Sequence, residues 1–432
     1  MSALARYFKA QGKSVSGYDK TETELTKQLV AEHIPVHYDE DLSKAPKDAD
    51  IVVYTPAVPA NHKELQYYRQ NNYQLLKRSE VLGLITNSSF NICVAGTHGK
   101  TTISTMIAHI LRHSGYGCNA FLGGVSVNYE TNFWSSPNNV CVVEADEYDR
   151  SFLRLSPDIA VITAMDPDHL DIYGTEKAME DAFIDFSAKV KPDGLLLSKF
   201  GLKRGSEFKA ANYKTYSLQN DSADVYGANI KITNGSYEYD VMMDDFMLDD
   251  VKLNMGGMHN VENSIAAIAV ARQLNIQWDK IKSAVEEFKG VKRRFEYIIR
   301  TKELVFIDDY AHHPEELRAL ITGAKALYPN KRCTVVFQPH LFTRTRDLAA
   351  DFAKVLDLAH EVILLPIYPA RELPIPGVSS NMILDRMYSD DKHLMSKDEL
   401  LNWVKTHEVE LFITAGAGDI DTLVQPLKEI LS

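Results

Sequence analysis

Residues 96–102, with the sequence GTHGKTT, have the residue types and the spacing of a loop that binds phosphate groups. An apolar run typical of a strand precedes them at residues 91–95, and a helical pattern follows as far as His113. Glycines let backbone N–H groups curl around phosphate oxygens, and the amino end of a helix adds a partial positive charge. Lys100 would then reach the β- and γ-phosphates of a nucleotide, and the hydroxyl of Thr101 would hold Mg²⁺.

The main alternative for this run is a glycine-rich turn with a solvated lysine. The general phosphate-loop pattern also requires a glycine where this sequence has Val94. The strand before the run and the helix after it nevertheless favour a phosphate site, because these elements aim the amino end of a helix at a ligand.

Acidic side chains follow the next two apolar runs of the sequence. The runs VCVVEA and IAVITA lead into EADE (144–147) and DPDH (166–169). Such runs are typical of parallel strands covered on both faces, and ligands gather at the carboxyl ends of those strands. A hard divalent ion prefers oxygen ligands and bridges phosphate oxygens, so we expect Glu144 to hold one metal ion. His169 would hold a second, for which Mn²⁺ is as suitable as Mg²⁺. An acidic loop with a hydrogen-bonded histidine is the alternative.

The wider pattern predicts an α/β protein of about three domains, given its 432 residues. The first region opens with a helix at residues 2–11, and the second contains an alanine-rich helix at residues 260–274. Apolar and polar residues alternate at residues 237–243, which predicts an antiparallel strand beside the second sheet. Four strands are expected in the third region, at residues 304–309, 333–337, 361–368 and 410–418.

Composition narrows the classes of function. The 47 Lys+Arg and 59 Asp+Glu residues give a net charge of −12, which argues against a protein that coats nucleic acid. The four cysteines are far apart in sequence and predict free thiols rather than a disulfide framework. No apolar run approaches 18 residues, and the first fifteen residues lack the apolar core of a signal peptide. We therefore expect a cytoplasmic protein.

With these motifs in place, the sequence resembles the Mur ligase family, the ATP-dependent amide-forming enzymes of peptidoglycan precursor synthesis. The motifs that carry the resemblance fall in family order: GTHGKTT (96–102), EADE (144–147), DPDH (166–169), GMHNVEN (257–263), GVKRRFE (290–296), DDYAHHP (308–314) and FQPHLFTRTRDL (337–348). The resemblance covers nearly the whole chain and implies three domains. These are an incomplete Rossmann-like UDP-sugar domain (1–88), a phosphate-loop ATP domain (89–298) and a Rossmann-like amino-acid domain (299–432).

Within the family, three features resemble the branch that adds L-alanine: EADE, the paired histidines of DDYAHHP, and TRTRDL. The resemblance implies an enzyme that joins L-alanine to the carboxylate of UDP-N-acetylmuramate through an acyl phosphate, with ATP and Mg²⁺ (or Mn²⁺). Such an enzyme would serve cell-wall biogenesis, and with it cell shape and division. It would bind neither nucleic acid nor membrane, and it would be a monomer or a weak homodimer. The alternatives are a ligase that reattaches a recycled tripeptide and a non-catalytic ATP-binding protein.

The resemblance also assigns site residues by motif. It implies that ATP is bound by Gly96, Thr97, His98, Gly99, Lys100, Thr101, Thr102, His259, Asn263, Arg294 and Asp309. It implies catalytic roles for Lys100, Glu144, His169 and Arg294, and metal ligation by Thr101, Glu144 and His169. The muramate and alanine sites are expected to contain His312, His313, His340, Arg344 and Arg346. As alternatives, the two adjacent histidines would cap the following helix, and one of the last two arginines would be structural.

The sequence departs from the family pattern in two places. The family's opening strand and its glycine loop, which contact the pyrophosphate of the nucleotide sugar, have no counterpart before the segment MSALARYF. We therefore expect this chain to bind the UDP-sugar more weakly than a version extended upstream. Several relatives carry a carbamylated lysine about fifteen residues after the DPDH histidine, where this chain has Ile184. No carbamate is expected, which agrees with the alanine-adding branch.

Overall fold

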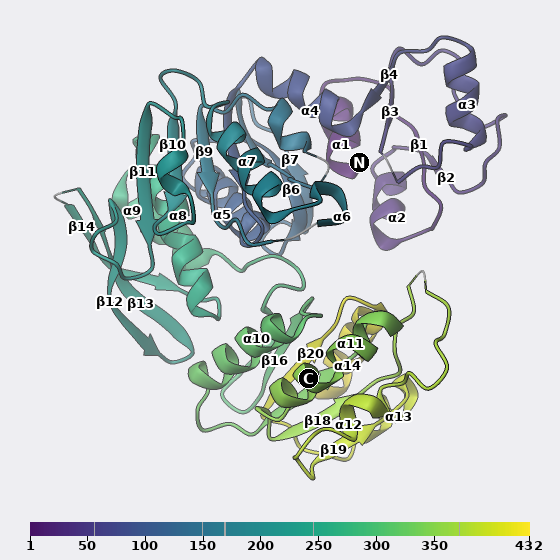
Figure 1. Cartoon of the computed structure of the whole chain (residues 1–432), viewed down its shortest axis with the longest axis vertical. Coiled ribbons are helices and arrows are strands. Elements are labelled where there is room, and N and C mark those ends of the chain that lie inside the picture. The colour runs from purple at the N-terminus through teal and green to yellow at the C-terminus, as the bar shows by residue number, and fades with distance from the viewer. Residues whose placement is uncertain (56, 149, 168–169, 245, 371) are drawn as a thin grey trace.

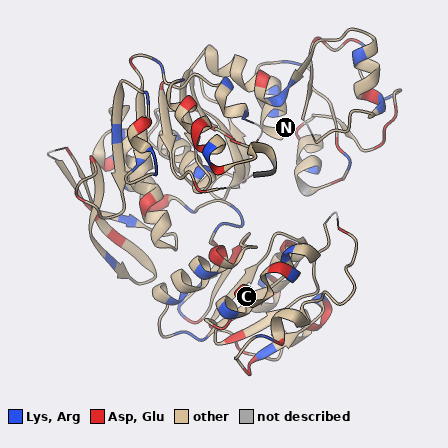
Figure 2. Ribbon diagram, viewed as in Figure 1, with Lys and Arg blue, Asp and Glu red and all other residues tan. Residues whose placement is uncertain are grey.

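A computed structural model describes residues 1–432 except 56, 149, 168–169, 245 and 371, and it leaves the side chains of residues 24, 170 and 171 undescribed. The described chain folds into three α/β regions that follow one another in sequence (Figure 1). Lys and Arg are interleaved with Asp and Glu over all three regions (Figure 2). Among the described residues, no helix combines the length and the apolar character that a membrane crossing requires.

The N-terminal region contains two small parallel sheets instead of one continuous sheet. β1 (Gly17–Tyr18) pairs with β2 (Val36–His37), and β3 (Val52–Tyr54) pairs with β4 (Leu75–Lys77). The helices of this region are α1 (Ser2–Ala10), α2 (Glu24–Ala31), α3 (Lys63–Gln70) and α4 (Arg78–Asn87). The fold of this region is therefore that of a Rossmann-like domain with a divided sheet.

The central region is built on a sheet in which ten described strands follow the order β14-β13-β12-β11-β10-β9-β5-β8-β6-β7. The strands are β5 (Phe90–Ala95), β6 (Asn119–Ser126), β7 (Thr131–Trp134), β8 (Val140–Glu144), β9 (Ile159–Ile162), β10 (Leu195–Lys199), β11 (Asn212–Ser217), β12 (Val225–Thr233), β13 (Ser236–Met243) and β14 (Phe246–Leu253). The helices are α5 (Lys100–His113), α6 (Leu170–Tyr173), α7 (Glu176–Ser187), α8 (Met258–Gln273) and α9 (Trp278–Glu287), with short 3₁₀ turns at Ser151–Arg154 and Gly205–Glu207. The seven strands β12-β11-β10-β9-β5-β8-β6, adjacent in that order, run parallel. β7 is an antiparallel addition at one edge of the sheet, and β13 and β14 are antiparallel additions at the other.

Strand β5 is buried on both faces, as its continuous apolar run predicts. Ile92 and Val94 pack into the core beneath α5, α8 and α9, while Cys93 and Ala95 pack into the opposite core beneath α4 and α7. Successive side chains of a strand point to opposite faces of the sheet, so one short run contributes to both cores. This double burial fixes the carboxyl end of β5, where the phosphate-loop sequence begins.

The C-terminal region has a sheet with the strand order β15-β16-β20-β17-β18-β19. Its strands are β15 (Glu296–Arg300), β16 (Val305–Asp309), β17 (Cys333–Phe337), β18 (Glu361–Leu364), β19 (Lys392–Leu394) and β20 (Leu411–Ala415). The helices are α10 (Pro314–Leu327), α11 (Phe342–Leu356), α12 (Asn381–Leu384), α13 (Lys397–Val404) and α14 (Val424–Leu431), with a 3₁₀ turn at Asp419–Leu423. β15 is antiparallel to β16 and the remaining pairs are parallel.

Several expected boundaries differ from the structure. The strand expected at residues 410–418 ends at Ala415. The strand expected at residues 361–368 ends at Leu364, because Pro366 has no N–H to continue the ladder beyond the last bond, from Leu365 N to Phe337 O. The expected domain boundary at residue 298 falls inside β15, where Ile299 pairs with Phe306 of the C-terminal sheet.

The central region contacts both of its neighbours through polar and aromatic side chains. Arg6 of α1 donates two hydrogen bonds to the carboxylate of Glu32 and a third, 2.9 Å long, to Asn132 Oδ1 of β7. Next to it, the Tyr7 ring packs against Phe121 of the central sheet. On the other side, Arg300 of β15 donates to Gly235 O in the turn between β12 and β13. Figure 1 shows the N-terminal and central regions side by side and the C-terminal region below them.

Candidate functional site

The phosphate-loop sequence forms a tight turn between β5 and α5. Gly96 and Gly99 both have positive φ, at 131° and 81°. A Cβ on Gly96 would lie 2.0 Å from Thr163 Oγ1, and one on Gly99 would lie 2.9 Å from Asn263 Oδ1. The loop is also bonded to the end of β9 through Thr97 N, which donates to Ala164 O at 3.1 Å. These contacts leave no room for side chains at the two glycines and place the loop between β9 and α8.

Lys100, the first residue of α5, turns back toward the loop. Its Nζ donates to Gly96 O at 2.6 Å and to Glu147 Oε1 at 2.8 Å. Glu147 is 1% exposed, and burial raises the pKa of its carboxyl group although Lys100 opposes the shift. Glu147 is the last residue of the EADE motif, and no role for it was predicted from the sequence. The sequence feature that could have indicated a role for Glu147 is its position three residues after Glu144, a predicted metal ligand.

Thr101 and Glu144 form the second polar pair of the loop. Thr101 Oγ1 donates to Glu144 Oε1 at 3.0 Å, and the other carboxylate oxygen accepts from Gly123 N at 3.0 Å. A Cβ on Gly123 would lie 2.3 Å from that carboxylate, so glycine is required for this approach. The hydroxyl and the carboxylate are oxygen donors beside a phosphate loop, which fits Mg²⁺. His169, expected to hold a second ion, lies outside the described residues.

The remaining residues expected around the nucleotide lie near the loop or at the start of α8. Thr102 is buried in the first turn of α5, while His98 is exposed, with its Nε2 3.7 Å from Asp166 Oδ2. His259 is exposed at the amino end of α8. Asn263, one turn further along α8, donates to Asn260 Oδ1 at 3.1 Å. Their contacts with ATP stay a prediction.

Asp309 ties the linker before β15 to the C-terminal sheet. Its Oδ2 accepts from Phe295 N at 2.6 Å and its Oδ1 accepts from Ala311 N at 2.7 Å. Burial raises the pKa of Asp309 to about 7, against the influence of these two bonds. The sequence predicted that Asp309 meets the nucleotide. In this structure both of its oxygens accept backbone hydrogen bonds, so any contact with the nucleotide would be additional to these two bonds.

The pair of adjacent arginines in the linker is divided between two environments. Arg293 has its Nε 3.3 Å from Asp308 Oδ2 and donates to Gly416 O, so it also ties the linker to the C-terminal sheet. Arg294 is exposed, and its side chain forms neither a hydrogen bond nor an ion pair with any described residue. An exposed and unpaired guanidinium is available to a ligand, as the motif assignment expects for Arg294.

We predict that Asp309 makes stability depend on pH. An aspartate has a pKa of about 3.9 when unfolded, so the folded protein binds more protons between about pH 4 and pH 7. This contribution to the free energy of unfolding is present below about pH 4 and is lost as the pH rises toward 7. Asp309→Asn should flatten the fall of the melting temperature between pH 5 and pH 8 by about 3 °C, which corresponds to roughly 3 kcal/mol for a chain of this length.

Thermal unfolding followed by circular dichroism measures this slope. Asp385→Asn changes an exposed carboxyl group in the same region and should keep the wild-type slope. A wild-type slope in Asp309→Asn as well would contradict the raised pKa.

The C-terminal region contributes a cluster of histidine and arginine at its strand ends. The His340 ring stacks on Tyr368, with centroids 5.8 Å apart, and lies 6.0 Å from the His312 ring. Arg344 Nη1 is 3.4 Å from His340 Nδ1. Burial and the Arg344 charge lower the pKa of His340, which favours a neutral imidazole. Leu341 has a φ of 71°, and such strain is often held at functional sites.

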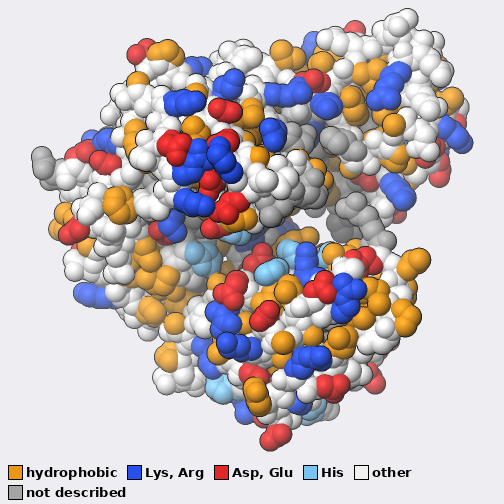
Figure 3. Space-filling model, viewed as in Figure 1, with side chains coloured by type: hydrophobic (Ala, Val, Ile, Leu, Met, Phe, Trp, Pro, Cys, Tyr) orange, Lys and Arg blue, Asp and Glu red, His pale blue; other side chains and the backbone are white. Residues whose placement is uncertain are grey.

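Two of the expected substrate residues stand apart from this cluster. Arg346 is paired with Asp347 at 2.7 Å, and both side chains are about half exposed. His313 occupies the position that caps α10, where its N–H donates to Glu316 Oε2 at 3.1 Å. The structure therefore brings together His312, His340 and Arg344, whereas Arg346 and His313 have local partners. Figure 3 shows histidine side chains at the hollowed junction between the central and C-terminal regions.

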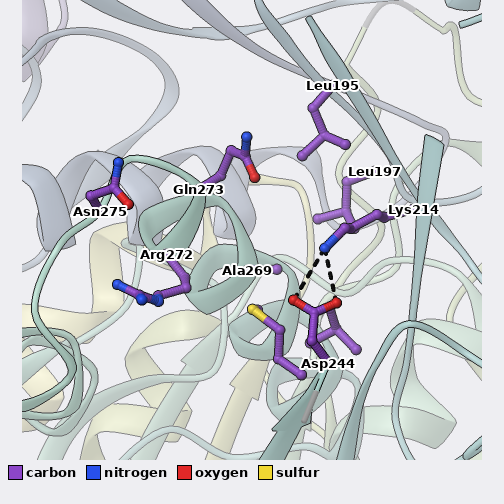
Figure 4. A pocket seen from close by; sticks show the side chains of 10 residues that line it. Leu195, Leu197, Lys214, Asp244, Ala269, Arg272, Gln273 and Asn275 are labelled. Carbon is purple, nitrogen blue, oxygen red and sulfur yellow. Dashed lines mark hydrogen bonds and ion pairs between the residues drawn. The ribbon is translucent and has the colours of Figure 1, made fainter. Parts of the chain in front are cut away.

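A separate hollow of about 290 Å³ lies at the carboxyl end of α8 (Figure 4). Its floor includes Leu195 and Leu197, and its lysine, Lys214, has its Nζ 3.1 Å from Asp244 Oδ1. The phosphate loop contacts the other end of α8, near Asn263. This hollow is distinct from the site, and its Lys214 charge is already paired.

Comparison with known proteins gives matches along almost the whole chain. Residues 1–89 match the family profile "Mur ligase family, catalytic domain", residues 94–271 match "Mur ligase middle domain", and residues 293–418 match "Mur ligase, glutamate ligase domain".

Individual proteins match at full length. A UDP-N-acetylmuramate–L-alanine ligase of Parabacteroides distasonis is 48% identical over 439 residues, which span 100% of this chain and 95% of the relative. The enzyme of the same name from Cytophaga hutchinsonii is 46% identical over 99% of this chain and 94% of its own. Among solved structures, the UDP-N-acetylmuramate–alanine ligase MurC from Thermotoga maritima is 29% identical, with a TM-score of 0.85 over 99% of this chain and 96% of that one.

Proposed function

The chain belongs to the Mur ligase family, and from that premise we propose that it joins L-alanine to the carboxylate of UDP-N-acetylmuramate at the expense of ATP. The observation that carries this function is the identity of 44–48% to alanine-adding ligases over the whole length of the chain. The paired Lys100 and Glu147 and the paired Thr101 and Glu144 supply the polar groups that a triphosphate and its metal ion need.

The reaction has two steps. The muramate carboxylate attacks the γ-phosphorus of ATP, which forms an acyl phosphate and releases ADP. The alanine amine then attacks the acyl carbon, and inorganic phosphate leaves. A bound Mg²⁺ would lower the repulsion between carboxylate and phosphate.

The phosphate loop performs the binding part of this reaction. Its backbone N–H groups and the amino end of α5 attract the phosphates, and the Lys100 ammonium offsets charge on the transferring group. Thr101 and Glu144 are the described residues that would hold Mg²⁺, since they place two oxygen donors beside the loop. Each of these groups is fixed before ATP arrives, which reduces the reorganisation that the reaction requires.

The alanine and muramate sites are proposed at the cluster of His312, His340 and Arg344. A guanidinium is a natural partner for the alanine carboxylate. A neutral His340 imidazole can accept a proton from the alanine ammonium, which must lose one before its nitrogen attacks. Because the cluster belongs to the C-terminal region and the phosphate loop to the central one, the two regions would close on each other during the cycle.

A tripeptide ligase of cell-wall recycling is the nearest alternative. A murein peptide ligase from Psychrobacter arcticus has a TM-score of 0.66 and 22% identity over 100% of this chain and 96% of that one. That level of identity establishes a common fold and does not indicate a common acceptor. The alanine-adding function is favoured because the relatives of that name are about twice as similar in sequence.

We predict that phosphate release requires both UDP-N-acetylmuramate and an amino acid, and that L-alanine supports the fastest turnover. The experiment measures phosphate released from ATP and Mg²⁺ with each acceptor alone and in combination. Turnover with the tripeptide and none with L-alanine would favour the recycling ligase. ATP binding without phosphate release under any condition would favour a non-catalytic protein.

We also propose that the enzyme works in the cytoplasm as part of peptidoglycan precursor synthesis. ATP and the UDP-sugar are intracellular metabolites, so a ligase that consumes both must meet them inside the cell. The four free cysteines, all buried, are compatible with a reducing compartment.

A further inference from the structure

Two acidic residues of the run EADE each contact a polar side chain of the phosphate loop. Glu144, at the end of β8, contacts Thr101, while Glu147 contacts Lys100. Metal ligation explains Glu144, but nothing in the proposed reaction yet explains why the phosphate-loop lysine has a buried carboxylate as its partner.

The backbone holds Glu147 firmly in this place. Its carbonyl oxygen accepts from Tyr173 OH at 2.6 Å and from Arg150 N at 3.0 Å. Its side chain is almost completely buried, and Oε2 has no hydrogen-bond partner among the described residues. A buried carboxylate oxygen without a partner is unfavourable in a purely structural ion pair, so its retention suggests a function.

The geometry leaves Lys100 ready for one further contact. A lysine ammonium has three N–H donors, and Gly96 O and Glu147 Oε1 accept two of them. Among the described residues nothing accepts the third, which leaves it for a phosphate oxygen. Because the lysine stem has four rotatable carbons, two fixed acceptors restrict the ammonium far more than one would.

We propose that Glu147 is a positioning residue that anchors the Lys100 ammonium at the mouth of the phosphate loop and shares its positive charge. The carboxylate competes with phosphate for that charge, so it weakens ground-state binding of the nucleotide. By fixing the ammonium, the carboxylate holds it where negative charge develops on the phosphate oxygens during phosphoryl transfer. This inference rests on the proposed binding of nucleotide at the loop, and not on the identity of the acceptor.

The test uses ADP binding without Mg²⁺, measured by calorimetry on the full chain. Glu147→Gln keeps an acceptor for Lys100 and removes the competing charge, so ADP should bind three- to tenfold more tightly. AMP, which lacks the β-phosphate, should bind as it does to the wild type. In turnover, the same variant should lower kcat by about tenfold while the KM for ATP falls.

Two further variants separate positioning from a structural role. Asp146→Asn changes the neighbouring carboxyl group and should leave ADP binding unchanged. In a Lys100→Ala background, Glu147→Gln should change ADP affinity much less, because most of the proposed action passes through the lysine. Unchanged or weaker ADP binding in Glu147→Gln, or an equal effect in both backgrounds, would overturn the inference. Failure of ADP to bind the wild-type chain would instead refute nucleotide binding at this loop.

Discussion

Lys100→Ala is expected to lower kcat by about a thousandfold, the largest effect that we predict for a single substitution. The variant loses the ammonium that offsets charge on the β- and γ-phosphates, and removing one such preorganised donor costs about a hundredfold to a thousandfold in other enzymes. The measurement is phosphate release in the presence of ATP, Mg²⁺, UDP-N-acetylmuramate and L-alanine. A rate within tenfold of the wild type would contradict the proposed site.

From the sequence alone, Lys100→Ala should leave folding intact, but the structure changes this expectation. Removing the lysine leaves the buried Glu147 carboxylate without its partner, which costs roughly 3 kcal/mol when the group is ionised. Glu147 already has a raised pKa, so in the variant it can take up a proton instead. A folded pKa above the unfolded value gives stability that is present at low pH and lost as the pH rises. The variant should therefore melt earlier than the wild type at pH 8, and the difference should shrink at pH 5.

The double variant Lys100→Ala, Glu147→Gln is the matched control for this effect. It removes both charges, so the melting temperature should return toward the wild-type value while turnover stays abolished. Recovery of turnover in the double variant would show that the single variant had lost activity through misfolding rather than through the missing ammonium.

The central part of the site was predictable because its chemistry is local in sequence. The glycines, Lys100 and Thr101 lie within seven residues, and the strand before them and the helix after them have clear apolar patterns. The adjacency of Glu144 and Thr101 follows from parallel pairing, since β5 and β8 are neighbours and end at the same edge of the sheet. Such a contact requires no knowledge of loop conformation.

The rest of the site depends on loops whose paths the sequence does not determine. Glu147 reaches Lys100 only because the turn after β8 folds back under Tyr173. Arg344 and Arg346 both lie in α11, and side chains two residues apart on a helix point in different directions. Arg344 therefore contacts His340, whereas Arg346 pairs with Asp347. Asp309 lies at a strand end as expected, but one of its two backbone donors, Phe295 N, belongs to the linker before β15.

Glu144→Gln should make the enzyme depend more strongly on Mg²⁺. Glutamine keeps the size of the side chain, but it has one acceptor oxygen where the carboxylate uses two, for Thr101 Oγ1 and for Gly123 N. The neutral side chain is also a much weaker ligand for a hard cation. We expect the Mg²⁺ concentration for half-maximal turnover to rise at least tenfold, and kcat at saturating Mg²⁺ to fall on the order of a hundredfold.

Binding measurements distinguish a metal ligand from a residue that only shapes the loop. Without Mg²⁺, ADP should bind Glu144→Gln at least as tightly as the wild type, because the variant removes a negative charge near the phosphates. With Mg²⁺, the wild type should gain affinity for ADP and the variant should gain much less. Thr101→Ser retains the hydroxyl that donates to Glu144 and should keep the wild-type response to Mg²⁺. An unchanged Mg²⁺ response in Glu144→Gln would remove Glu144 from the metal site. The oxygen pair beside the loop would then serve only to hold Thr101 and Gly123 together.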